Sequence, residues 1–421
     1  MIGEPVILLL MLGIFALSIF IFKIPAGVAL MLAAVSGALA GGEGLAIRHL
    51  VEGSFGFLEA ILIITTAMIF MKVAETSGVL PTISYWMIQK MYHRPTVLFM
   101  VIGLFIMFPG MLTGLSSACV LTTGALILPA LLAMGMPVIV AGSFVALMSV
   151  LGAVAPPICI PVMIIGGGVD MPYVGFGWPL LLASFPLAII ICLIFRYKYV
   201  HEFNVDEVLR QLPEPVSNKY GFRLFLPIIF VIGYLLLENL IPQYIIHLGV
   251  PLIFMIGALI GVWSGERFKV IPVVRAAIRA ASPVVAILVG VGMFLQVLTL
   301  TGVRGWIAVN SMQLPDEIKY LGALIIPFFG SAYTGASVIG VPLVYVFSTK
   351  NAIVVTAALA LMSSVGDLMP PPSMLFAYAA QMIQEKNHFK MLRFSIKYIV
   401  IILAASILML LFAGQIARLL F

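Results

Sequence analysis

The chain has 421 residues, of which 63% are apolar and 9% are charged, and its mean hydropathy is +1.22. Soluble domains carry about 25% charged residues, so this composition excludes an ordinary soluble protein. The net charge of +6 comes from basic residues in short segments between apolar stretches, and it does not indicate nucleic-acid binding. The spacing of Cys119, Cys159 and Cys192 fits neither a disulfide framework nor a metal site. We therefore expect an all-α, multi-pass membrane protein.

Apolar runs of about 20 residues, each long enough to cross a bilayer, recur along the whole chain. The first run is expected to be a span rather than a cleavable signal peptide, because Glu4 opens it and no small-residue cleavage site follows. The stretch 95–134 is interrupted by Pro109-Gly110 and Thr113-Gly114, which predicts a re-entrant hairpin. In the first half we predict five spans, at 5–22, 25–41, 55–77, 137–168 and 174–196.

A polar segment, 197–221, follows and is predicted to be a cytoplasmic linker. The second half then repeats the layout of the first. Its interrupted stretch, 318–349, predicts a second re-entrant hairpin, broken at Gly330–Gly335. Segments 43–53 and 266–280 occupy equivalent places, and we expect helices lying in the membrane interface, with loops as the alternative. The predicted spans of the second half are 223–241, 244–264, 283–302, 351–384 and 394–418.

Two short motifs recur in the same order in both halves. Residues 148–157 align without gaps on residues 362–371, and each segment ends in a Pro-Pro pair. Upstream, Thr113-Gly114-Leu115-Ser116 matches Thr334-Gly335-Ala336-Ser337. Because each half contributes five crossings, an odd number, the halves must have opposite orientations. We predict two inverted repeats, 1–196 and 222–421, with about ten crossings and two re-entrant hairpins.

Charge tests this topology independently. With both termini outside, 17 of the 22 basic residues fall on the cytoplasmic side, which satisfies the positive-inside rule. The first hairpin then enters the membrane from the cytoplasm and the second from outside. Five basic residues remain outside: Arg48, Arg304, Lys319, Lys350 and Arg418.

The segments Gly152–Pro161 and Gly366–Ser373 place prolines in the middle of predicted spans. Proline cannot donate a backbone hydrogen bond, so helix should stop there and release carbonyl groups that can bind a hard cation such as Na⁺. Ordinary packing around a proline kink is the alternative. One candidate cation site comprises Thr113, Gly114, Ser116, Ser117, Gly152, Pro156 and Pro157. The other comprises Thr334, Gly335, Ser337, Gly366, Asp367, Pro370 and Pro371.

Asp367 is the acidic residue at the core of a predicted break, and an ionisable group at membrane depth is a functional candidate. It can ligate a cation or carry a proton; pairing with a neighbouring helix is the alternative. Helices that start beyond the breaks present N–H groups, which suit the negative group of a small organic anion. Hydroxyl groups that can hold such a solute are those of Ser116, Ser117, Ser337 and Ser373.

No catalytic constellation is present in the sequence. Ser116 and Ser117 lack a nearby histidine or lysine that could act as a base, so we expect no enzyme activity. Apart from Na⁺ as a coupling ion, no cofactor or metal is predicted. A channel-like or structural membrane protein, in which the breaks serve packing alone, is the competing hypothesis.

The sequence resembles the large membrane subunit of the tripartite ATP-independent periplasmic (TRAP) transporters, the DctM-like family. The likeness rests on the segments 23–30, 113–118 and 151–157. It implies an elevator-type carrier of the ion-transporter superfamily, in which a domain of hairpins and broken helices slides against a scaffold.

The resemblance further implies sodium-driven uptake of a small organic anion, such as a C4-dicarboxylate, across the bacterial inner membrane. Its implied partners are a periplasmic substrate-binding protein, a small membrane subunit and membrane lipid. A stand-alone or proton-coupled carrier of the same superfamily, needing no binding protein, is the alternative.

Overall fold

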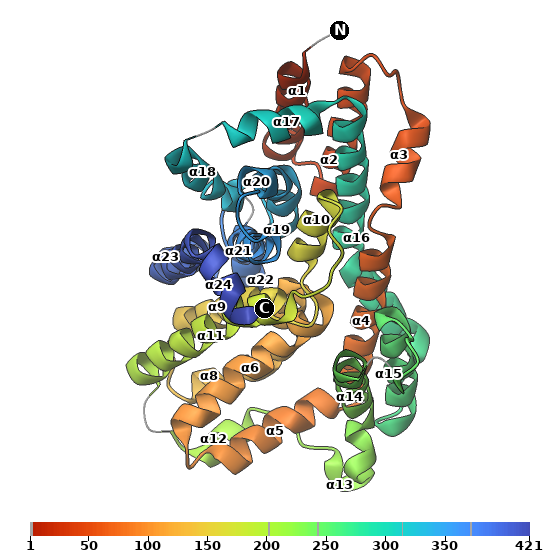
Figure 1. Ribbon diagram of the computed structural model, residues 1–421. Coiled ribbons are helices and arrows are strands. Elements are labelled where there is room, and N and C mark those ends of the chain that lie inside the picture. Colours follow the sequence, from red (N-terminus) through yellow and green to blue (C-terminus); the bar gives the residue numbers. More distant parts are fainter. Residues whose placement is uncertain (1–2, 201–202, 242–243, 314, 371–372) are drawn as a thin grey trace.

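The computed structural model describes residues 3–200, 203–241, 244–313, 315–370 and 373–421, and within these ranges the fold is all-helical (Figure 1). Six of the described helices are long and apolar enough to cross a membrane, or seven if the bent pair Ile47–Ser54 and Leu58–Thr76 forms one span. The predicted fold class, an all-α membrane protein with several apolar spans, is therefore confirmed.

One group of helices packs around α16 (Val270–Leu300), which contacts α2, α3 and α4 along its length. Small residues permit this packing: a Cβ atom at Gly27 would lie 2.5 Å from the backbone of Ala286, and one at Gly290 would lie 2.4 Å from the Gly27 carbonyl oxygen. Close backbone approach at small residues is typical of helix association in membranes. This α16 group comprises α16 with α1 (Glu4–Phe20), α2 (Ala26–Ala40), α3 (Ile47–Ser54), α4 (Leu58–Thr76), α14 (Leu226–Leu240) and α15 (Val250–Ser264).

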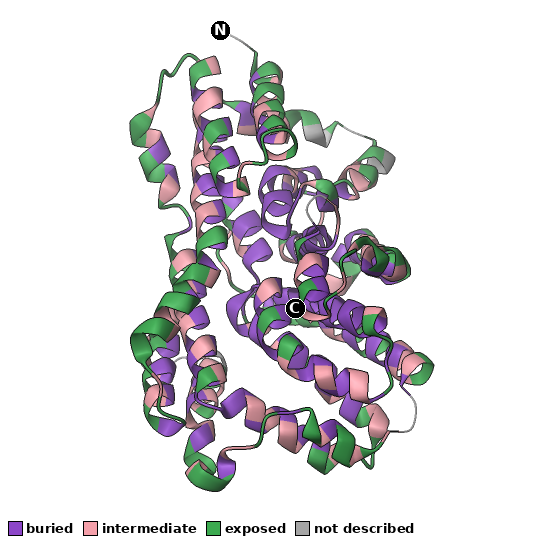
Figure 2. Ribbon diagram, turned by 180° about the vertical axis from the view of Figure 1, so that it is seen from behind, coloured by how far each residue is buried: buried purple, intermediate pink, exposed green. Residues whose placement is uncertain are grey.

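The remaining spans pack around α9 (Val138–Val154) and α21 (Ala352–Ser364), which form the most deeply buried part of the molecule (Figure 2). Every residue of 140–154 and of 354–364 is buried. This α9 group takes from the first half α6 (Pro95–Thr113), α7 (Ser116–Cys119), α8 (Ala125–Ala133), α10 (Ile160–Gly168) and α11 (Gly177–Tyr199). From the second half it takes α18 (Asp316–Ala323), α19 (Ala332–Gly335), α20 (Val341–Val346), α22 (Met374–Met382) and α23 (Phe389–Leu411).

The two hairpins differ in the length of their arms. Pro95–Thr113 and Ser116–Ala133 are each long enough to span, whereas Ile318–Phe328 and Ala332–Val346 are shorter. The helices α2 and α15 have 15 residues each, or about 22 Å at 1.5 Å per residue, which is less than the hydrocarbon thickness. Ten crossings and the boundaries of the inverted repeats therefore remain predictions.

The expected division between an interfacial helix at 266–280 and a span at 283–302 is wrong. Val270–Leu300 is one helix of 31 residues, with Pro283 inside it. Residues Arg275 to Ala281, which precede Pro283, are mostly strong helix formers, so nothing stops the helix before the proline. In the first half the equivalent segment is separate, since α3 is bent by 42° from α4.

Several shorter helices connect the long helices of the two groups. α5 (Val79–Met91) joins α4 to α6, and α17 (Val303–Met312) joins α16 to the second hairpin; the apolar pattern predicts neither. The linker contains the short helices α12 (Val205–Arg210) and α13 (Ser217–Tyr220), and α24 (Ala413–Leu420) ends the chain. Helices α5, α12 and α13 lie at one end of the molecule, opposite α1, α17 and α18 (Figure 1).

Candidate functional site

The tip of the first hairpin is a tight, buried turn. α6 ends at Gly114, which has φ +67° and whose N–H donates to the Gly110 carbonyl at 2.6 Å. A Cβ atom at Gly114 would lie 2.6 Å from the Ile160 side chain, so both conformation and space require glycine. The Thr113 hydroxyl donates to the Pro109 carbonyl at 2.7 Å and accepts from the Leu115 N–H at 3.1 Å. Thr113 therefore fixes the turn, and Ser116 opens the returning helix.

The first break lies between α9 and α10, at Ala155–Cys159. A cis peptide joins Pro156 to Pro157. The hydroxyl of Tyr173 pairs with two backbone groups there: it donates to the Pro157 carbonyl at 2.9 Å and accepts from the Cys159 N–H at 3.0 Å. Tyr173 thus bridges the two sides of the break. The sequence pattern does not indicate this role.

The tip of the second hairpin is held by a reciprocal cap. Ser331 precedes α19; its N–H donates to the Thr334 hydroxyl at 3.1 Å, and its own hydroxyl accepts from the Thr334 N–H at 3.3 Å. The Thr334 hydroxyl also donates to the Phe329 carbonyl, and the Ser337 hydroxyl donates to the Thr334 carbonyl at 3.0 Å. A Cβ atom at Gly335 would lie 2.7 Å from the Ile326 carbonyl oxygen, so this tip is also closely packed.

Asp367 connects the second break to both hairpin tips. It ends the 3₁₀ turn that follows α21, and it is 6% exposed. Its Oδ2 accepts from the Ser116 hydroxyl at 2.5 Å, and its Oδ1 accepts from the Ala332 N–H at 2.9 Å. Among the residues that the structure describes, no lysine, arginine or histidine forms an ion pair with it. The carboxyl group is thus hydrogen-bonded, and none of the described side chains gives it a positive partner.

A second contact joins the two tips directly. The Tyr333 hydroxyl donates to the Gly114 carbonyl at 3.3 Å. The sequence analysis does not include Tyr333 among the candidate site residues, although Tyr333 directly precedes the Thr334-Gly335 motif. Segments more than 200 positions apart in the chain therefore meet around Asp367.

The structure brings some predicted site residues together and leaves others apart. Ser116 and Asp367 meet directly, and Gly114 accepts a hydrogen bond from Tyr333 of the other tip. Thr113, Gly152, Thr334, Gly335, Ser337 and Gly366 are buried in the surrounding turns, where hydrogen bonds or close packing hold them. Ser117, Pro156 and Pro370 are half-buried, Pro157 is exposed, and Pro371 lies outside the described residues.

Ser373 differs from the other predicted solute ligands. It precedes α22 in a left-handed conformation, with φ +51°. Its side chain is fully buried, and its hydroxyl has no hydrogen-bond partner among the described residues. A buried hydroxyl without a partner costs free energy, so this group is available to a ligand.

The arrangement around Asp367 is suited to exchange of a cation. Two donors stabilise the negative carboxylate, but burial away from water and the lack of a counter-charge among the described side chains penalise it. Binding of a proton or a small metal ion at the carboxylate removes that penalty. Because the ligands come from two hairpins and a broken helix, movement of either hairpin would alter affinity for the cation.

No known protein family matches the sequence, and no curated protein matches it. Solved structures share the fold, and two of them are membrane transporters. MtrF of Neisseria gonorrhoeae, described as illuminating a class of antimetabolite efflux pumps, superposes with a TM-score of 0.64 at 16% identity over 99% of this chain and 96% of MtrF. The YdaH transporter of Alcanivorax borkumensis superposes with a TM-score of 0.60 at 17% identity, over 87% of both chains.

At these identities the likeness establishes the fold alone. The chain has the fold of two membrane transporters, in agreement with the expected transporter architecture. The likeness is not specific for the tripartite family, whose resemblance rests on the short sequence motifs.

Proposed function

We propose that this chain is a secondary active carrier of a small organic anion that works without a separate binding protein. Its coupling ion is a proton, carried by Asp367. The observation behind this proposal is the buried Asp367 carboxyl group, held by Ser116 and Ala332 and lacking a basic partner among the described residues.

Binding of a proton neutralises the Asp367 carboxylate with the smallest rearrangement of its surroundings. Protonation neutralises the carboxyl group while both donors remain within hydrogen-bond distance, whereas a metal ion also needs several oxygen ligands grouped around it. A charged carboxylate in this position costs several kcal/mol, so its protonation state and the packing of the hairpin tips are coupled. That coupling is what a proton-driven carrier requires.

The stand-alone assignment is supported by the extent of the structural likeness. MtrF, described as an efflux pump, is covered over 96% of its length by this single chain. A small membrane subunit and a periplasmic binding protein have no role in this proposal. Transport by an elevator movement of the α9 group against the α16 group fits the division of the fold into two helix groups.

The solute site is assigned to the space between the hairpin tips and the two broken helices. The unpartnered hydroxyl of Ser373 stands at the N-terminal end of α22, where backbone N–H groups favour a negative ligand. Ser116, Ser117 and Ser337 supply further hydroxyl groups at the tips. A small carboxylate suits this combination of donors.

Sodium-coupled uptake in a tripartite system is the second candidate. It is favoured by the carboxylate oxygen atoms of Asp367 and the adjacent Ser116 hydroxyl, because hard cations prefer such ligands. In that case the serine hydroxyl would turn to present its oxygen to the ion.

Transport by purified protein in liposomes separates these candidates. A panel of radiolabelled carboxylates is offered under an imposed pH gradient or an imposed sodium gradient, with no periplasmic protein added. We expect concentrative, saturable transport with the pH gradient alone. Dependence on sodium, or on an added binding protein, would contradict the proposal, and non-saturable flux without counterflow would identify a channel.

A further inference from the structure

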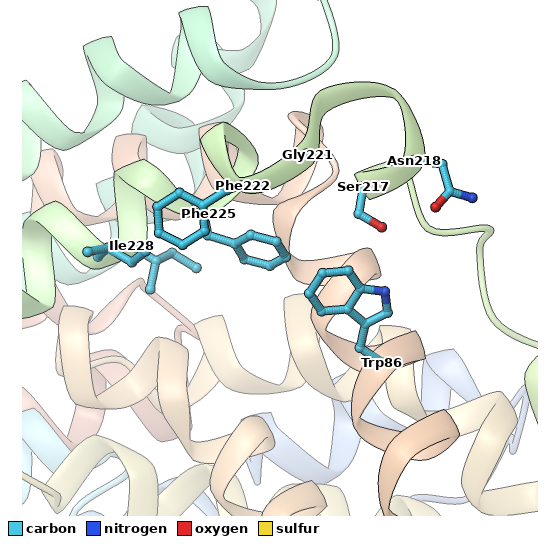
Figure 3. Close-up of a pocket in the computed structure, with 8 residues that line it drawn as sticks. Trp86, Ser217, Asn218, Gly221, Phe222, Phe225 and Ile228 are labelled. Carbon is cyan, nitrogen blue, oxygen red and sulfur yellow. The ribbon is translucent and has the colours of Figure 1, made fainter.

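A pocket remote from Asp367 opens between α5 and the segment that runs from α13 into α14 (Figure 3). It has a volume of about 500 Å³. Its walls are mainly apolar: Phe222, Phe225, Ile228 and Ile229 on one side and Trp86 of α5 on the other. The ring centroids of Trp86 and Phe225 lie 5.0 Å apart, so the two walls are in contact with each other. Phe222 is 72% exposed, which leaves a bulky apolar side chain uncovered at the rim.

Three basic residues lie on the segments that line this apolar pocket. The Lys90 ammonium group lies 4.9 Å from the Trp86 ring centroid, and Lys219 stands between the lining residues Asn218 and Gly221. Arg223 lies between the lining residues Phe222 and Phe225; its guanidinium group packs 4.8 Å from the Trp263 ring and donates to the Trp263 carbonyl. An apolar groove whose lining segments carry basic residues is complementary to an anionic amphiphile.

A buried polar group inside the pocket also lacks a partner. Ser217 lines the pocket and is 7% exposed, and its hydroxyl forms no hydrogen bond with the described residues. This orphan donor is independent of the surrounding charges. A ligand oxygen at the same depth would satisfy it.

We propose that this pocket binds an anionic phospholipid of the cytoplasmic leaflet. One acyl chain lies against Phe222, Phe225 and Ile228. The phosphate faces Lys90 and Lys219, and a glycerol or ester oxygen accepts from Ser217. The positive-inside rule predicts that this end of the molecule faces the cytoplasm, and tryptophan is enriched at the level of the headgroups. The lipid would lie beside α5, the helix that connects α4 of the α16 group to α6 of the α9 group.

Thermal unfolding in detergent, with titrated phosphatidylglycerol or phosphatidylcholine, tests the charge preference. We expect saturable stabilisation by phosphatidylglycerol only. The double variant Lys90→Gln/Lys219→Gln should weaken its apparent affinity about 25-fold, or about fivefold for each charge. Lys198→Gln, which removes an exposed basic side chain at the end of α11, is the matched control and should bind as the wild type does. Equal stabilisation by both lipids or by inorganic phosphate, or an equal loss in the control, would overturn the proposal.

Fluorescence quenching by brominated lipids tests the location without altering a charge. The Trp86 contribution is the difference between the wild type and Trp86→Phe. At equal mole fraction, brominated phosphatidylglycerol should quench this contribution more strongly than brominated phosphatidylcholine. Quenching that does not distinguish the two lipids would show that the pocket has no anionic lipid preference and would overturn the assignment.

Discussion

Ser116 and Asp367 are 251 positions apart in the chain, yet the serine hydroxyl donates to the aspartate at 2.5 Å in the buried centre of the molecule. This contact joins the first hairpin to the second broken helix. Asp367 also accepts from the Ala332 N–H at the second hairpin tip. A change in the charge of one carboxyl group therefore reaches three moving parts of the proposed carrier at once.

Replacing Asp367 by asparagine removes the proposed proton carrier at almost constant volume. We expect Asp367→Asn to lower gradient-driven accumulation about 5- to 150-fold, the range of typical coupling free energies, while solute counterflow persists. Glu238→Gln is the control, since Glu238 pairs at 3.2 Å with His247, which is exposed. Liposome accumulation and counterflow assays measure both activities. Equal losses in the two variants would remove Asp367 from the mechanism.

The hydroxyl groups of Tyr173 and Tyr333 should differ in their contribution to stability. Tyr173 bridges two backbone groups at the first break, whereas Tyr333 joins the two hairpin tips. Tyr173→Phe leaves the Pro157 carbonyl and the Cys159 N–H without their shared partner, so we expect a loss of about 1–3 kcal/mol in unfolding free energy. Tyr333→Phe removes a single longer hydrogen bond to Gly114 and should cost about 1 kcal/mol or less. Denaturant or thermal unfolding compares them. The opposite order of destabilisation would contradict the assigned roles.

The first hairpin tip requires glycine at position 114. Gly114→Ala forces a side chain into a left-handed conformation and against Ile160, and we expect it to destabilise the protein by about 1–3 kcal/mol. Gly233→Ala in α14 is the control, because nothing lies within 4 Å of the added Cβ, and alanine favours helix by up to about 1 kcal/mol. Thermal unfolding of both variants is the measurement. A harmless Gly114→Ala would show that the tip is looser than described.

The proposed elevator movement should be arrested by a cross-link between the two helix groups. A Cβ atom at Gly167 of α10 would lie 2.9 Å from the ring of Phe57, which precedes α4. We expect the double variant Phe57→Cys/Gly167→Cys to lose transport when a short bifunctional thiol reagent is added. Either single variant should be unaffected, since Cys119, Cys159 and Cys192 are buried. Full transport by demonstrably cross-linked protein would contradict an elevator.

Much of the fold could be predicted because membrane spans follow from local composition. Apolar runs identify α6, α11 and α23, since crossing hydrocarbon requires about 20 apolar residues. α5 was not predicted, because its residues Thr82, Ser84, Gln89 and Lys90 interrupt the apolar pattern. The division of α16 failed for the opposite reason: proline inside a membrane helix can be tolerated, so Pro283 does not mark an end.

The site could be predicted only in part. Asp367 and Ser116 were selected separately, from the cost of burying charge and from the hairpin motif, but assigned to different cation sites. Their contact, and that of Tyr333 with Gly114, depends on how the two halves pack. Local sequence carries no information on such distant pairing. Tyr173 was missed because its role depends on two backbone groups freed at a break 14 and 16 positions earlier.

Infrared difference spectroscopy can show whether Asp367 carries a proton, because it detects the protonation of a carboxyl group without knowledge of the solute. Spectra of purified wild type, Asp367→Asn and Glu238→Gln are recorded as the pH is changed, in sodium and in potassium. We expect a protonated-carboxyl band that titrates with pH, is indifferent to sodium, persists in Glu238→Gln and is lost in Asp367→Asn. A carboxylate at position 367 that stays ionised at every pH tested, or whose signal responds to sodium rather than to pH, would contradict this expectation.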